Sequence, residues 1–156
     1  MSDRNLVDIY AAVADRVITM ETGKRKKIKA WGLDQVKNRV VGDHLPIRIV
    51  LPPGADGGSA IEEFDIVTFD SATITWRITD LMLYQSAGRG GGLRNIWQVL
   101  TEYVWQYTSY FNANRAIGNG QLVGLQPQAG IFEWPRGSGT QFHGVNMVVQ
   151  VMETLC

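Results

Sequence analysis

The stretch from Thr73 to Asn112 constrains this chain most, because it predicts a long strand, a glycine-rich turn and a long helix. Apolar Ile74, Trp76 and Ile78 alternate with polar neighbours, which is typical of a strand with one buried face. Glycines at 88–92 interrupt this alternation. Apolar residues then recur three and four positions apart on one helical face: Leu93, Ile96, Trp97, Leu100, Val104, Tyr107 and Phe111. A strand and a helix with one apolar face each bury those faces by packing together.

The alternation in the long strand fails at Asp80. Leu81 and Leu83 have the opposite parity from Ile78. Either a β-bulge at Asp80 or burial of both strand faces beyond it would explain the change. Of the two roles open to Asp80, satisfying backbone donors at a bulge is favoured over acid–base work.

The remainder of the chain predicts a helix and several strands. The first helix begins at Ser2 or Asp3 and ends at Gly23, and its apolar residues cover more than one face: Leu6, Val7, Ile9, Tyr10, Val13, Ala14, Val17, Ile18 and Met20. Strands are expected at 47–51, 64–69, 122–125, 131–134 and around 145–151, with a turn at 127–130. We therefore predict a single α+β domain over residues 1–156.

Charge is balanced overall but not along the chain. Fifteen basic residues match fifteen acidic ones. Between Thr22 and Arg48, eight Lys and Arg face two Asp, a net charge of +6, whereas between Ile49 and Asp80 six acids face Arg77, a net charge of −5. These segments are either two solvated loops or complementary patches on neighbouring copies of the chain.

The basic segment contains five closely spaced cations, which are Lys24, Arg25, Lys26, Lys27 and Lys29. Their mutual repulsion predicts that the segment is exposed. It is either a solvated loop or a contact for DNA phosphates or an acidic partner.

The chain is expected to remain in a reducing, aqueous compartment. Cys156 is the only cysteine, so neither a disulfide framework nor a cysteine-rich zinc site is predicted. The N-terminal residues lack an apolar signal-peptide region, and no apolar run is long enough to span a membrane.

No catalytic or cofactor site is predicted. A dinucleotide fingerprint would need glycine where Leu93 stands, and a P-loop would need Gly-Lys-Ser/Thr, so the glycine turn is interpreted as a flexible connection. His44 and His143 are expected to have structural roles. Glu102 lies opposite the apolar stripe of the long helix and is expected to be solvated or paired.

Trp105 is the most informative surface residue. It lies roughly 140° from the centre of the helical stripe, so it is predicted on the outer face. Either a loop of the same chain or a partner protein would cover it, because aromatic residues are enriched in interface cores. Arg89 and Arg136, in the two glycine-containing turns, are further candidates for contact with protein or DNA.

The order of these elements resembles the tail terminator and related neck proteins of long-tailed bacteriophages. The resemblance rests on the first helix, the strand Ile47–Leu51, the glycine-rich loop, the long strand, the aromatic helix and the closing strand that begins Phe142-His143-Gly144. It implies a mixed, mostly antiparallel sheet with the N-terminal helix and the long amphipathic helix packed on one face, and extended loops. The basic segment is longer than the resemblance leads us to expect.

The resemblance also implies a function. The chain would be a non-enzymatic virion protein that forms a six-membered ring, caps the tail tube and joins it to the head connector. Its partners would be further copies, the tail tube protein, connector proteins and DNA in the lumen, after assembly in the host cytoplasm. A head–tail adaptor or tail completion protein is the alternative. A small phosphate- or nucleic-acid-binding α+β protein is a more remote one.

Overall fold

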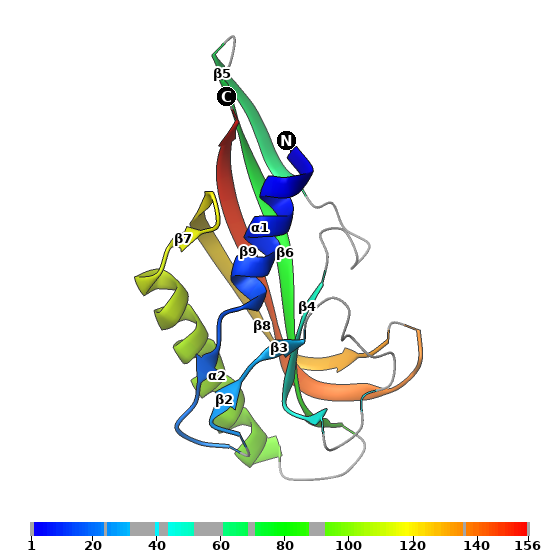
Figure 1. Ribbon diagram of the computed structural model, residues 1–156. Coiled ribbons are helices and arrows are strands. Elements are labelled where there is room, and N and C mark those ends of the chain that lie inside the picture. Colours follow the sequence, from blue (N-terminus) through cyan, green and yellow to red (C-terminus); the bar gives the residue numbers. More distant parts are fainter. Residues whose placement is uncertain are drawn as a thin grey trace.

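The computed structural model describes residues 2–23, 25–31, 40, 44–51, 61–68, 71–87, 93–135 and 137–155 (Figure 1). The elements, in chain order, are α1 (Ser2–Ala14), β1 (Ile18–Thr19), β2 (Lys27–Ile28), β3 (Ala30–Trp31), β4 (Ile47–Leu51), β5 (Ile61–Thr68), β6 (Ser71–Ser86), α2 (Leu93–Ala113), β7 (Ala116–Ile117), β8 (Gly120–Glu133) and β9 (Gln141–Leu155).

The main sheet has seven strands and confirms the predicted α+β class. Six strands follow the order β3-β4-β6-β9-β8-β7, and β5 pairs with β6. Only β3 and β4 pair in parallel among the described strands, so the sheet is mixed but mostly antiparallel. A separate hairpin of β1 and β2 lies beside α2 (Figure 1).

Strand β6 is the centre of the sheet. Its first half pairs with β5, its second half pairs with β4, and almost its whole length pairs with β9. Pairing with β9 is continuous from Ala72 to Leu83, so the bulge considered at Asp80 is wrong; the register shifts only between Leu83 and Gln85. The other explanation is confirmed, because every residue from 78 to 84 is buried.

Two apolar cores on opposite faces of the sheet cause this burial. On the helix face, Ile78 and Met82 of β6 pack with Val149 of β9 and with the buried residues of both helices. On the opposite face, Leu81 and Leu83 form a smaller cluster with Val40, Leu45, Ile47, Ile49 and Phe142. A strand between two apolar layers does not alternate, and this explains the change of parity at Asp80.

The close pairing of β6 and β9 requires a glycine. A Cβ atom at Gly144 would lie 2.0 Å from the carbonyl oxygen of Met82. No side chain fits at that separation, so glycine is needed where the register shifts.

The first helix is shorter than predicted. It ends at Ala14, and the expected end at Gly23 is wrong. Arg48 donates hydrogen bonds to the carbonyl oxygens of Val13 and Arg16 and so binds the end of the helix. Gly23 instead lies between β1 and β2 with φ of 99°, a conformation that favours glycine.

Two further predictions are wrong. The buried stripe of α2 contains Tyr103, which is fully buried, and not Trp97, which is 61% exposed. Trp97 lies about 80° from the stripe centre at 100° per residue, so it points away from the sheet. Residues 120–133 form one continuous strand, and the turn expected around Pro127 is absent there. β9 pairs along this length, and proline is tolerated in an edge strand.

Candidate interaction surfaces

A buried polar network connects α1, β4, β6 and α2. The side chains of Arg48 and Asp80 are both 0% exposed, and a guanidinium nitrogen lies 2.6 Å from a carboxylate oxygen. The hydroxyl of Tyr107 donates to the same carboxylate at 2.7 Å. Tyr10 donates to the carbonyl oxygen of Val50 in β4. These contacts fix both helices to the centre of the sheet.

The electrostatics of this network favour protonated tyrosines. Burial, and secondly the charge of Asp80, raises the pKa of Tyr10 to about 12. The same two causes raise the pKa of Tyr103 and of Tyr107 well above the usual value. Burial acts to lower the pKa of Arg48, but the charge of Asp80, the interactions with Tyr103 and Tyr107 and the hydrogen bond to Asp80 together raise it, so the net shift is upward. The network is closed to solvent, so its role is structural.

The predicted role of Asp80 at a bulge is therefore replaced by an ion pair. Sequence reasoning counted Arg48 only as part of the basic segment and missed its partner. The available signal was one isolated charge of each sign within two apolar strands, in Ile47–Leu51 and near Leu81. Buried charges of this kind are normally paired.

Another buried carboxylate has a different environment. Glu153 of β9 is 2% exposed, and neither carboxylate oxygen has a hydrogen-bond partner among the described residues. It is opposite Ile74 of β6, near Trp76, whose indole nitrogen is likewise buried without a described partner. The sequence predicted Trp76 on the buried face of the long strand, but nothing in the spacing indicated that Glu153 is buried beside it.

The predicted basic segment is a hairpin held against α2. Of its five cations, Arg25, Lys26, Lys27 and Lys29 are exposed, and Lys24 lies outside the described residues. The Glu102 carboxylate accepts hydrogen bonds from the amide of Glu21 at 2.5 Å and from the amide and hydroxyl of Thr22. Glu102 is thus paired, one of its two expected states.

The same contacts account for the direction in which the pKa of Glu102 is shifted. Burial acts to raise it, but the hydrogen bonds from Thr22 and Glu21 and the nearby charge of Lys26 lower it overall. This carboxylate therefore fixes the position of the basic hairpin relative to the outer face of α2.

The outer face of α2 carries exposed aromatic residues. Trp105 is 71% exposed and Trp97 is 61% exposed, so neither is covered by the described residues. The prediction that Trp105 lies on the outer face is confirmed. Nearer the end of the helix, the Arg16 guanidinium lies over the rings of Phe111 and Tyr110, at 4.7 and 5.6 Å from their centroids.

Strand β5 is exposed at the other end of the molecule (Figure 1). Phe64 is 52% exposed and Ile66 is 77% exposed. Glu63 and Asp65, which alternate with them along the strand, are also exposed. A hydrogen bond between the Glu63 and Asp65 side chains, and secondly the charge of Asp65, raises the pKa of Glu63.

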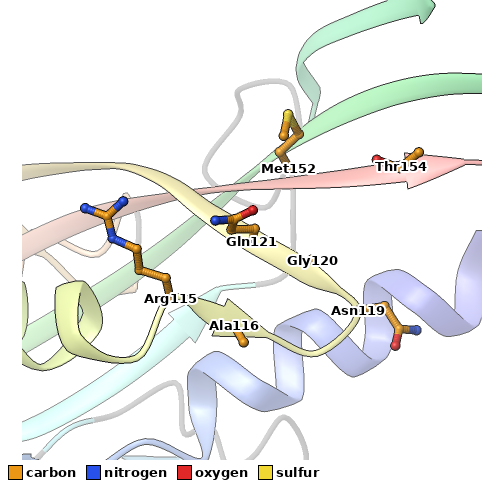
Figure 2. A pocket seen from close by; sticks show the side chains of 7 residues that line it. All are labelled: Arg115, Ala116, Asn119, Gly120, Gln121, Met152 and Thr154. Carbon is orange, nitrogen blue, oxygen red and sulfur yellow. The ribbon is translucent and has the colours of Figure 1, made fainter.

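Two pockets lined by described residues do not resemble an active site. A pocket of about 400 Å³ lies between β7, β8 and β9, and Figure 2 shows Arg115 and Asn119 pointing away from each other there. An adjoining pocket of about 590 Å³ extends along the second half of α2. Arg115 is bound to Asn112 at 2.6 Å, so the cation shared by both pockets already has a partner. Binding sites usually combine an apolar cavity with converging polar groups.

Within the described residues, no group of three or more His, Cys, Asp or Glu could hold a metal ion. No described helix is long and apolar enough to cross a membrane. Comparisons with family models, curated proteins and solved structures found no match for this chain.

The remaining predicted site residues cannot be placed. Arg89, Arg136 and the glycine turn at 88–92 lie outside the described residues. His44 lies edge-on to Trp31, with ring centroids 5.5 Å apart, and His143 is half-buried in β9. The structure therefore offers exposed surfaces on the basic hairpin, α2 and β5 as candidates for contact with a partner.

Proposed function

We propose that this chain is a structural virion protein of a long-tailed bacteriophage, similar to tail terminators. In this proposal it forms a ring, with six copies expected, that caps the tail tube and joins it to the head connector. The proposal rests on the resemblance described from the sequence and on one structural observation. An α+β domain whose helices are bound to the sheet by the buried polar network exposes apolar and charged surfaces at both ends.

These surfaces suit a subunit that contacts neighbours on two sides. Monomeric proteins rarely expose large apolar side chains together, and such groups mark interaction sites. Here Phe64 and Ile66 are exposed on one strand, and Trp97 and Trp105 are exposed on one helix. A subunit in a ring uses two different surfaces of this kind, one for each neighbour.

The test is to mix the purified protein with the tail tube protein of the same phage and to image the mixture by cryo-electron microscopy. We expect six copies around one axis at the tube end. The double variant with Trp105→Ala and Phe64→Ser tests the two surfaces, because it removes one exposed aromatic side chain from each. It should form no ring. A monomer bound off-axis, or no binding to tubes, would reject the proposal.

The same images address the alternative neck components. A head–tail adaptor or tail completion protein would contact the connector and leave the tube end uncapped. Adding connector particles in a parallel sample separates these cases, because a tail terminator would bind the tube end as well as the connector, whereas the alternative components would bind the connector and leave the tube end uncapped.

DNA contact is supported by one specific observation, the four exposed cations of the basic hairpin. If DNA passes them in the lumen, binding to duplex DNA should weaken steeply as salt rises from about 50 to 200 mM. Replacing Arg25, Lys26, Lys27 and Lys29 by Ser should remove this salt dependence and leave stability almost unchanged. Salt-independent binding would reject a phosphate contact.

A further inference from the structure

We propose that β5 of one copy binds the outer face of α2 and the basic hairpin of the next copy. This inference rests on the proposed function, because it names the contact that would connect neighbouring subunits of the ring. The partner is a second copy of this chain. The argument uses the chemistry of the two surfaces and their positions in the molecule.

The first surface is β5, which joins an apolar face to an acidic one. Phe64 pairs with Ile74 and Ile66 pairs with Ala72, so both side chains lie on the helix face of the sheet. Glu63 and Asp65 alternate with them and point to the opposite face. The outer edge of β5 has no strand partner among the described residues.

The second surface joins aromatic and basic groups. Trp105 follows Glu102 by three residues, so it lies one turn further along α2 and about 60° around the helix. Glu102 holds the hairpin at Glu21 and Thr22, and the charge of Lys26 acts on the same carboxylate. The hairpin cations and the exposed indole of Trp105 therefore border one surface.

The two surfaces are complementary in both respects. Phe64 and Ile66 would cover the exposed indoles, and Lys27 and Lys29 would face Glu63 and Asp65. Glu63 and Asp65 are both exposed in the single copy. Opposite charges across an interface also select the correct partner.

Their positions favour head-to-tail assembly. Figure 1 shows β5 at one end of the molecule, and the β1–β2 hairpin with the first half of α2 toward the other. A contact between two different surfaces is heterologous, and it closes into a ring when the rotation per subunit allows.

The experiment uses two charge-reversed variants of the full chain. Variant A carries Glu63→Lys and Asp65→Lys, and variant B carries Lys27→Glu and Lys29→Glu. Each variant alone would place like charges across the contact, so we expect about a hundredfold weaker self-association and no rings at the tube. All four positions are exposed, so thermal unfolding should match that of the unchanged protein.

Mixing the variants provides the decisive measurement. The altered β5 of A fits the altered hairpin of B, and the unchanged β5 of B fits the unchanged hairpin of A. An alternating ring with an even number of subunits should therefore form again. A control with Asp8→Lys and Asp15→Lys makes the same charge change as variant A at exposed positions in α1 and directly after it, and it should assemble normally.

The outcomes separate the two proposals. If the unchanged protein forms no ring at the tube, the proposed function and this contact both fail. If the unchanged protein forms rings and either variant alone also does, the function stands and the contact is wrong. Loss of rings in both variants without recovery on mixing likewise rejects the pairing of these two surfaces.

Discussion

Replacing Asp80 by Asn should be among the most destabilising single changes in this protein. The substitution keeps the shape of the side chain and removes its charge, which leaves the Arg48 guanidinium buried without a counter-ion. Removing one partner of a buried ion pair typically costs about 3–5 kcal/mol. Because domains of this size are stable by only about 5–15 kcal/mol, this single change would remove a large share of the total.

A double-mutant cycle distinguishes the ion pair from other effects. Arg48→Met should also cost about 3–5 kcal/mol, because it isolates Asp80 and the carbonyl oxygens of Val13 and Arg16. Combining it with Asp80→Leu, which is also measured alone to complete the cycle, removes both charges, and only the unpaired Tyr107 hydroxyl and helix carbonyls remain, at about 2–4 kcal/mol in total. We therefore expect the double variant to be more stable than either single one, or equal to it.

Urea denaturation followed by tryptophan fluorescence measures each change as a shift of the midpoint at constant slope. Lys27→Met serves as the control, because it removes a cation from an exposed position and should change stability by at most about 0.5 kcal/mol. A cost of less than about 1 kcal/mol for Asp80→Asn would refute the reasoning. So would strictly additive costs in the cycle, since they would show that Arg48 and Asp80 do not interact.

Three further predictions concern the side chains of Tyr10, Glu153 and Glu102. The pKa of Tyr10 is about 12 in the folded protein, against 10.0 for an unperturbed tyrosine. The protonated Tyr10 hydroxyl therefore makes its full contribution to stability below pH 10, and this contribution is lost as the pH rises through about 12. Tyrosinate absorbance during alkaline unfolding checks this. Glu153→Leu removes a buried carboxylate without a described partner, so it should raise the free energy of unfolding by about 1–3 kcal/mol in urea; a fall would reveal a partner for Glu153. Glu102→Gln should speed amide exchange at Thr22, and the protection of this amide in the unchanged protein should fall only below the usual pH range of a glutamate, because the pKa of Glu102 is lowered; identical rates in the two proteins would contradict the hydrogen bonds.

The spacing of apolar residues along the chain predicted those helices and strands that bury one face against a single apolar layer. The long helix and the alternating half of β6 each pack one face on one apolar layer, so spacing was sufficient. The change of parity at Leu81 indicated either a bulge or two buried faces, and the second is observed. Periodicity failed where apolar residues serve another element. Ile18 and Met20 continue the spacing of α1, yet both are buried after the helix has ended.

The site residues depended on register, which spacing along the chain does not contain. Arg48 and Asp80 are separated by 32 positions and meet because Val50 lies opposite Asp80 and Arg48 opposite Met82. Which residues of β4 and β6 face each other is decided by the whole sheet. The continuity of β8 was missed for the same reason, since Pro127 and Gly130 indicate a turn unless a long partner strand is known.

The same network that fixes the fold bears on assembly in the proposed ring. β5 is attached to the first half of β6, and α2 is attached to the middle of β6 through the hydrogen bond from Tyr107 to Asp80. Glu102 then fixes the basic hairpin to α2. The angle between the two proposed contact surfaces is thus determined by strand β6 and by the carboxylates of Asp80 and Glu102. Heterologous contacts close into a ring only when each subunit turns the chain of copies by the same angle. A rigid connection between the surfaces therefore favours one closed ring size over open or mixed assemblies.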